Sequence, residues 1–321
     1  MALSKNDVQK FGSEFASLSQ NIETVLFGKR TVIDLIIAAM VSEGHVLLED
    51  FPGTGKTALA RALSQSIKGV SQRIQFTPDL LPGDVTGITV YDQKKGSFSF
   101  HQGPIFANVV LADEINRASP KTQSALLEAM EEARVTTDGV TRSTGSPFLV
   151  IATQNPIEQA GTYRLPEAQL DRFMIKTSVG YPDNTSTVRI LEGTAQAASD
   201  LKPVMSLDRI LWMVEVARNA FISQPVMDYI ARLVEATRTA PQVKMGSSVR
   251  GARNLAKLAR TWALAKGRNY VIPDDIKDTA EAVLAHRIVI DPEAEFDGVT
   301  ANAIIAQILL QTVPPVGPET E

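Results

Sequence analysis

Residues 46–58 carry side chains whose types and spacing could hold a triphosphate. An apolar run at 46–48 leads into a turn at 53–57 that reads Gly-Thr-Gly-Lys-Thr. The glycines let backbone N–H groups close around phosphate oxygens, Lys56 brings a cation to the β- and γ-phosphates, and the Thr57 hydroxyl can ligate Mg²⁺. Apolar residues at helical spacing follow, so a helix N-terminus adds the positive end of its dipole. The stretch predicts a phosphate cradle between a strand and a helix.

Asp50 departs from the usual form of this loop, which has Gly or Ala at its first position. Aspartate tolerates turn and left-handed conformations better than most residues, so the turn can still form. A carboxylate close to a triphosphate would repel it, so we expect Asp50 to point away. Because so short a motif arises by chance in roughly a few per cent of chains of this length, the surrounding sequence has to decide.

Two further apolar runs end in polar residues that could act on the same phosphates. The run at 109–112 ends in Asp113 and Glu114, the Walker B form, and the run at 148–153 leads to Asn155. An α/β fold keeps its ligand at the carboxyl ends of its parallel strands. There Asp113 would hold Mg²⁺ through its water shell, Glu114 would activate water as general base, and Asn155 would orient that water. The alternatives are an ordinary acidic turn and an ordinary Asn-Pro turn.

Residues 165–173 predict a short helix that carries Arg172 beside an aromatic residue. One interpretation pairs Arg172 locally with Asp171 or Glu167. The other has it reach the nucleotide of a neighbouring subunit, because an arginine supplied in trans stabilises charge in the transition state. Sequence spacing does not distinguish the two.

Together these motifs resemble the AAA+ ATPases, and within them the MoxR family most closely. The resemblance rests on residues 44–57, 111–118, 126–132, 152–156 and 165–173, and it spans most of residues 25–290. It implies an α/β fold: an AAA+ P-loop NTPase core, with a parallel sheet sandwiched by helices, followed by a small all-α lid domain.

The resemblance also implies roles for single residues. The catalytic residues would be Lys56 of Walker A, Glu114 of Walker B, Asn155 as sensor 1, Arg172 as arginine finger and Arg250 as sensor 2 at the γ-phosphate. Nucleotide contacts are expected from Gly28, Pro52, Gly53, Thr54, Gly55, Lys56, Thr57, Ala58, Asp113 and Arg250, with Thr57 and Asp113 as the ligands of Mg²⁺. Arg253 is the alternative to Arg250, and for either arginine the alternative role is membership of a solvated basic helix face.

Domain boundaries follow from a change of pattern near residue 200. We expect a nucleotide-binding core at 1–200, a helical lid at 201–313 and a flexible tail at 314–321. Amphipathic spacing predicts lid helices at 206–220, 225–239, 248–265 and 273–287. Alternating residues predict two hairpin inserts, near 86–102 and 133–144. Three aromatic residues of the first hairpin could grip a client or simply pack together: Tyr91, Phe98 and Phe100.

Composition limits the remaining possibilities. The chain has 321 residues, 44% of them hydrophobic, a net charge of −4, three histidines and no cysteine. Disulfides, thiolate metal sites and thiol catalysis are excluded, and the acidic balance weighs against nucleic acid as an obligatory partner. The longest apolar stretch, at 32–41, is too short to span a bilayer, so we expect no membrane insertion and a cytoplasmic location.

The functional prediction is an ATP-hydrolysing, ring-forming motor with ATP and Mg²⁺ as cofactors. The resemblance implies a hexamer that remodels or assembles client proteins or inserts their cofactors, together with a partner that carries a von Willebrand factor A domain. One alternative is a nucleotide-gated scaffold with little turnover, against which Glu114 argues. The other is a nucleic-acid remodelling motor, which the acidic charge disfavours.

Overall fold

A five-stranded parallel sheet forms the centre of the N-terminal part of the chain. The computed structural model describes residues 3–51, 53–94, 96–155, 162–193 and 197–315. The strand order is β2-β5-β8-β1-β9, with β2 at Ser71–Gln75, β5 at Val109–Asp113, β8 at Leu149–Gln154, β1 at Val46–Glu49 and β9 at Ile175–Thr177. The three apolar runs noted in the sequence are thus the three central strands. The edge strands β2 and β9 were not predicted, because the polar sequence of β2 and the brevity of β9 hide the signal.

Alternating side chains of the central strands pack on opposite faces of the sheet, as the two-residue period of a strand requires. Leu47, Val110 and Val150 join one apolar cluster, which contains α5 (Pro120–Glu132). Val46, Val109 and Leu149 join the other, which contains α1 (Lys5–Glu23), α2 (Arg30–Val41) and α3 (Lys56–Ser66). With both faces covered, the strands are apolar throughout, and the sheet is sandwiched between helices as expected.

Four amphipathic helices form most of the lid, at the predicted places: α8 (Leu207–Arg218), α9 (Gln224–Thr239), α10 (Val249–Ala265) and α11 (Pro273–Leu284). Ser206 and Ser248 cap α8 and α10, each accepting a backbone N–H with its hydroxyl. A 3₁₀ turn, η3 (Ala285–Arg287), extends α11 to the predicted end. The lid continues through elements that were not predicted: β10 (Val243–Met245), β11 (Val289–Ile290), α12 (Pro292–Phe296) and α13 (Ala301–Gln311).

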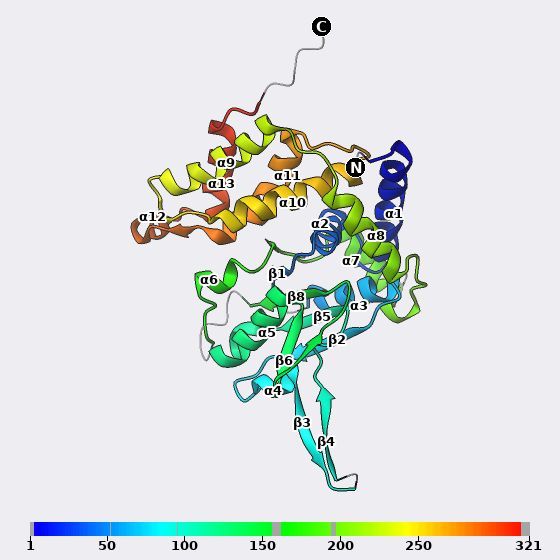
Figure 1. The fold of residues 1–321 in the computed structure, drawn as a ribbon. Coiled ribbons are helices and arrows are strands. Elements are labelled where there is room, and N and C mark those ends of the chain that lie inside the picture. The colour runs from blue at the N-terminus through cyan, green and yellow to red at the C-terminus, as the bar shows by residue number, and fades with distance from the viewer. Residues whose placement is uncertain (1–2, 52, 95, 156–161, 194–196, 316–321) are drawn as a thin grey trace.

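The lid shares its apolar core with the first two helices of the chain. One cluster of buried side chains runs without a break from α1 and α2 into α8, α9, α10 and α11. In Figure 1 the lid helices accordingly lie above the sheet, with α1 and α2 against them. Short elements complete the chain: α4 (Pro82–Thr86), η1 (Ile115–Arg117), α6 (Glu167–Leu170), α7 (Asn184–Leu191) and η2 (Ala198–Asp200). Within the described residues no helix has both the length and the apolar character needed to cross a membrane.

Both predicted hairpins are present. Strands β3 (Gly87–Asp92) and β4 (Ser97–Gln102) pair antiparallel and extend away from the body of the molecule (Figure 1). Strands β6 (Arg134–Thr137) and β7 (Val140–Ser143) pair around Asp138 and Gly139, whose φ angles are 52° and 75°. Two positive φ angles are what a type I′ turn needs, which explains the Asp-Gly pair. On the first hairpin Tyr91 and Phe98 contact each other edge to face.

Candidate active site

One cavity gathers most of the predicted nucleotide residues at the carboxyl edge of the sheet. Its volume is about 460 Å³, within the usual range for a small-molecule site. The end of β1, the start of α3 and the ends of β2, β5 and β8 contribute to its wall. The lining residues are Asp50, Gly53, Thr54, Gly55, Lys56, Thr57, Arg73, Gln75, Asp113, Glu114, Thr153, Gln154 and Asn155.

The phosphate loop, residues 50–57, has the backbone of a cradle. Gly53 and Gly55 have φ angles of +83° and +90°, which residues with a Cβ rarely adopt. A Cβ built at Gly53 meets nothing within 4 Å, so it is the positive φ rather than lack of space that favours glycine there. Gly55 caps α3, which places the helix N-terminus at the cavity. The Lys56 Nζ donates to the Phe51 carbonyl at 2.8 Å, so the cation lies against the loop it serves.

Asp50 points away from this cradle, as the sequence predicts. Its carboxylate accepts hydrogen bonds from the Ser178 hydroxyl at 2.9 Å and from the backbone N–H groups of Val179 at 2.6 Å and Gly180 at 2.9 Å. The side chain is buried. A carboxylate that receives three donors is satisfied inside the protein and need not face a phosphate. Asp50 therefore ties the phosphate loop to the segment that follows β9.

Asp113 and Glu114, the predicted Walker B pair, have partners that sequence reasoning missed. Asp113 accepts from the Thr153 hydroxyl at 2.6 Å and from Arg73 Nη2 at 2.7 Å. Arg73 and Gln75 lie on β2, the edge strand that was not predicted. Their spacing of two residues, which places them on one face of a strand, is the only signal in the sequence that could have identified them. These contacts orient Asp113 by hydrogen bonding on both of its oxygens.

The Glu114 side chain is also held by hydrogen bonds from its neighbours. Gln75 Nε2 and Arg117 Nη1 each donate to Glu114 Oε2 at 2.9 Å. The Glu114 backbone has φ +58°, and its N–H donates to the Thr153 hydroxyl at 2.9 Å. A left-handed conformation is costly for a residue with a Cβ and is found most often at functional sites. The carboxylate is thus aimed by its backbone and by two donors.

Thr57 and Asp113 fit a magnesium ion that is held mainly through phosphate and water. Mg²⁺ usually takes one or two protein oxygens and keeps several waters beside substrate phosphates. Among the described residues no cluster of three His, Asp or Glu side chains could hold a metal by itself. A hydroxyl at Thr57 and a carboxylate at Asp113, both lining the cavity, are the donor set that such an ion needs.

Asn155 lines the cavity at the end of β8, the strand between those that end in the phosphate loop and in Asp113. Two predicted contacts, Gly28 and Ala58, lie outside the described wall of this cavity. Gly28, between α1 and α2, lies near Ser186, since a Cβ there would come within 3.0 Å of its hydroxyl. Ala58 packs partly into the apolar core. Pro52 falls outside the described residues.

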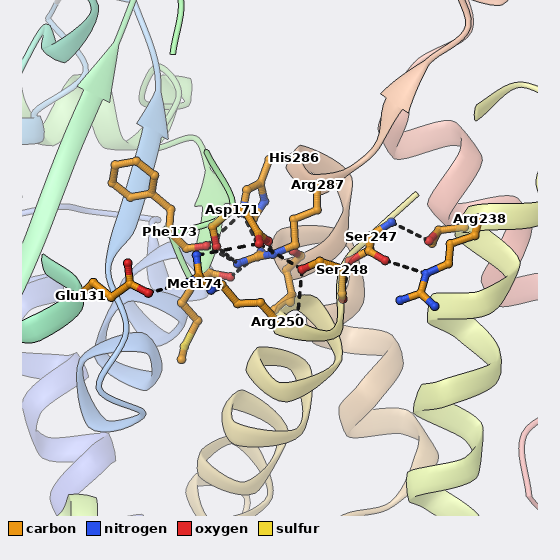
Figure 2. Close-up of polar contacts among 12 residues, drawn as sticks. Glu131, Asp171, Phe173, Met174, Arg238, Ser247, Ser248, Arg250, His286 and Arg287 are labelled. Atoms are coloured by element: carbon orange, nitrogen blue, oxygen red, sulfur yellow. Dashed lines mark hydrogen bonds and ion pairs between the residues drawn. The ribbon is translucent and has the colours of Figure 1, made fainter. Parts of the chain in front are cut away.

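Arg172 and Arg250 lie together, away from the phosphate loop. Among the described residues that line the nucleotide cavity neither of them occurs. Both instead line a second cavity of about 220 Å³, together with Arg253, and both form an ion pair with Glu131. The N–O distances are 3.3 Å for Arg172 and 2.6 Å for Arg250 (Figure 2 shows the latter). Arg250, which the sequence led us to expect at the γ-phosphate, is therefore not among the described residues that line this cavity.

The reason for this difference is the position of the lid. Helix α10 packs on α1 and α2 through the shared apolar core, and its first turn meets the α6–β9 connection rather than the phosphate loop. Spacing along a chain cannot specify how one domain docks on another. The expected local pair of Arg172 with Asp171 or Glu167 is also replaced, because Glu131 on α5 takes that place.

A buried histidine stands at the start of β1. His45 Nδ1 accepts the Val150 N–H at 3.0 Å, and Nε2 lies 2.9 Å from the Met130 carbonyl. Burial lowers the pKa of His45 from 6.5 to about 4, and the bond to Met130 opposes that change. The ring is therefore neutral at pH 7, with its proton on Nε2, and joins β1 to β8 and α5.

Comparisons with known proteins agree with this architecture. The sequence matches the model of the ATPase family associated with various cellular activities (AAA) over residues 45–175 and that of the AAA lid domain over 235–308. It is 48% identical to YeaC of Bacillus subtilis, covering 92% of this chain and 93% of that protein. It is 40% identical to a protein named Chaperone MoxR1 of Mycobacterium tuberculosis, covering 91% and 80%. A crystal structure from Cytophaga hutchinsonii superposes with a TM-score of 0.91 at 37% identity, covering 97% and 98%.

Proposed function

The chain belongs to the MoxR family of AAA+ ATPases, and from that premise we propose that it binds ATP with Mg²⁺ and hydrolyses it to remodel client proteins. The observation that carries the proposal is the single cavity in which a glycine cradle, a lysine, a carboxylate pair and an amide converge. Membership of the family supports ATPase activity in general, and the named chaperone among the relatives supports a chaperone-like role.

Each residue then has a distinct task. Lys56 neutralises charge on the β- and γ-phosphates, and Thr57 and Asp113 hold Mg²⁺. Bound there, Mg²⁺ would neutralise negative charge on the phosphate oxygens and so reduce their repulsion of the attacking water. Glu114 accepts a proton from the attacking water, and Asn155 orients that water.

Arg172 and Arg250 act on the nucleotide of a neighbouring subunit. They lie outside the cavity of their own subunit, and their shared partner Glu131 is half-exposed, so both cations are accessible from outside. An arginine supplied in trans contributes a factor of about 10³–10⁵ to phosphoryl transfer. A ring, with a hexamer as the expected size, is the assembly in which every subunit both gives and receives these arginines.

The setting and the partners complete the proposal. A cytoplasmic location fits a chain without cysteine. A protein client and a partner with a von Willebrand factor A domain follow from the family. Nucleic acid is not required, because the net charge of −4 provides no general attraction to phosphate backbones.

The test is ATP turnover measured against protein concentration, with the assembly state read in the same samples. We expect specific activity to rise as subunits associate and to disappear in Glu114→Gln, which still binds ATP. Lys56→Ala should lose ATP affinity, and unchanged affinity would contradict the nucleotide assignment. Tight binding without turnover in the assembled wild type would instead favour the nucleotide-gated scaffold.

A further inference from the structure

The most heavily bonded buried cation of the lid, Arg287 in η3, grips the connection that carries Arg172. Its side chain is 1% exposed. Nε donates to Asp171 Oδ1 at 2.8 Å, Nη2 to the Asp171 carbonyl at 3.0 Å, and Nη1 to the Met174 carbonyl at 3.1 Å. A further bond goes to the Phe173 carbonyl. Figure 2 shows these contacts converging on residues 171–174, which we call the finger turn.

Such a contact is unusual because a buried charge is costly unless it is fully paired. Burial lowers the pKa of Arg287 to about 10, an effect that Asp171 opposes, so the group remains a cation at pH 7. The contact in turn stabilises the finger turn, because three of its backbone carbonyls and one carboxylate accept hydrogen bonds in a buried place. Only a planar guanidinium offers five donors in a fixed fork, so a lysine could not replace it.

A second contact from the lid reaches the same carboxylate. The Ser248 hydroxyl at the start of α10 donates to Asp171 Oδ2 at 3.0 Å. The loop before Ser248 is itself held, because Arg238 Nε donates to the Ser247 carbonyl at 2.9 Å. Close packing at this point requires Gly251, where a Cβ would lie 2.1 Å from the Ser247 hydroxyl oxygen and 3.1 Å from Arg287 Cδ. Two separate lid elements thus converge on Asp171.

Arg172 is only weakly held by its own side-chain contact. Its guanidinium pairs with Glu131 at 3.3 Å, and both groups are partly exposed. Exposed ion pairs of this kind contribute only about 0–1 kcal/mol. The direction of the Arg172 side chain therefore depends on its backbone, which lies between Asp171 and the buried Phe173.

We propose that Arg287 is a positioning residue for Arg172: the lid fixes the finger turn and thereby aims the arginine at the neighbouring nucleotide. This inference rests on the trans role of Arg172 proposed above. The competing explanation is that Arg287 only stabilises the joint between the two domains. The two explanations differ in which active site suffers when Arg287 is lost.

The experiment is a mixing assay in the assembled full-length protein. Arg287→Met should retain ATP binding and assembly but lose at least about tenfold in turnover, because its neighbours receive a misdirected arginine. Glu114→Gln subunits are inactive themselves but keep an intact finger turn. Mixing the two should restore turnover several-fold, since active sites of Arg287→Met subunits now receive correctly aimed arginines.

Arg268→Met is the matched control within the lid. Arg268 forms a two-bond ion pair with Asp275, at 2.7 Å and 2.6 Å, and the Asp275 side chain is fully buried. Its loss destabilises the lid without touching the finger turn, so turnover at a temperature where the variant is folded should remain near wild type. A drop equal to that of Arg287→Met would mean that any lid damage has this effect, and would overturn the inference.

A mixture of Arg172→Ala with Glu114→Gln tests the trans role of Arg172 separately from the positioning role of Arg287. If that mixture recovers and the Arg287→Met mixture does not, the trans arginine stands and the positioning role is overturned. If neither recovers, the trans role itself fails.

Should Arg287→Met not fold, Ser248→Ala removes the second lid contact to Asp171. It should show a smaller loss that mixing with Glu114→Gln also recovers, and no recovery would again count against the inference.

Discussion

At the scale of single residues, Asp50 shows how a departure from a motif becomes a structural link. The usual loop has a small residue here, and this chain has a buried carboxylate that receives three donors from residues 178–180. Those donors lie directly after β9, the strand next to β1. The start of the phosphate loop is therefore held twice: by β1, which precedes it, and by this contact of its first residue.

Asp50→Ala should weaken both the fold and nucleotide binding. It leaves the N–H groups of Val179 and Gly180 without their acceptor, and a buried unsatisfied donor costs about 1–3 kcal/mol. We expect the melting temperature to fall by several degrees and ATP affinity to drop, as measured by thermal unfolding and titration. Asp50→Asn keeps one acceptor and should lie between the variant and wild type; equal ATP affinity in all three would refute the link.

His45 predicts a pH dependence of stability. Its folded pKa of about 4 lies below the unfolded value of 6.5, so the unfolded chain binds the extra proton between these values. Stability is full above pH 6.5 and falls as pH drops toward 4. The total loss is roughly 3 kcal/mol, because each tenfold difference in proton affinity corresponds to about 1.4 kcal/mol. His286, whose pKa burial also lowers, acts in the same direction.

Urea unfolding at pH 7.5 and pH 4.5 measures this dependence. His45→Gln removes the titrating group and should reduce the difference between the two pH values, although its stability at pH 7.5 is lower. A variant with the full wild-type difference would show that other groups cause the acid sensitivity.

At the scale of elements, the β3–β4 hairpin is fixed at its base and free at its tip. A Cβ at Gly87 would lie 2.4 Å from the His101 carbonyl oxygen, and one at Gly103 would lie 2.3 Å from that of Val85. At the base of the hairpin, the backbone around Gly87 and Gly103 is therefore packed too closely to admit a side chain at either position. Toward the tip, Phe98 is 74% exposed. The hairpin thus has a closely packed base and exposes apolar side chains such as Phe98 toward its tip.

Gly87→Ala and Gly96→Ala test this arrangement as a matched pair. Both glycines have positive φ, but a Cβ at Gly96 has its nearest contact at 3.9 Å, with the Tyr91 hydroxyl. Gly96→Ala should cost only about 1–2 kcal/mol locally, whereas Gly87→Ala must also displace backbone. We expect proteolysis within residues 88–101 to accelerate strongly in Gly87→Ala and slightly in Gly96→Ala. Equal rates would mean that the base does not hold the hairpin.

At the scale of the whole molecule, the docking of the lid places Arg250 beside Arg172 and outside the described wall of the nucleotide cavity. The start of helix α10 contacts Asp171 and Glu131. Arg250 therefore lies beside Arg172 rather than in the described wall of the phosphate cavity. The lid and the finger turn form one continuous structure, linked by the buried Arg287. Under the trans role proposed above, the position of the lid therefore affects the active site of the neighbouring subunit.

Arg250→Ala should therefore affect turnover only in the assembly. We expect ATP affinity of dilute, dissociated subunits to match wild type, because Arg250 is absent from the described wall of their cavity. Turnover at assembling concentrations should fall by at least about tenfold. Weaker ATP binding by the isolated subunit would show that Arg250 serves its own site, and would restore the arrangement expected from the sequence.

The sequence by itself predicted the three central strands, the four main lid helices, both hairpins and most residues of the cavity wall. Residues 53–57, the pair Asp113–Glu114 and Asn155 each follow an apolar run, and local patterns of this kind reflect strand burial and turn chemistry that act over a few residues. Serine caps and helical spacing likewise located the lid helices, and Asp-Gly located a type I′ turn. These signals are local, so one sequence is sufficient to read them.

Only the tertiary structure decided which distant groups meet. Arg73 reaches Asp113 over 40 positions, and Arg287 reaches Asp171 over 116. Such contacts depend on strand order and on how the lid docks, which arise from the summed burial of many side chains rather than from any local pattern. That is why the Gly-Lys-Thr loop, Asp113, Glu114 and Asn155 could be identified from the sequence, whereas Arg73 and Gln75 of the cavity wall, the position of Arg250 and the buried contact of Arg287 could not.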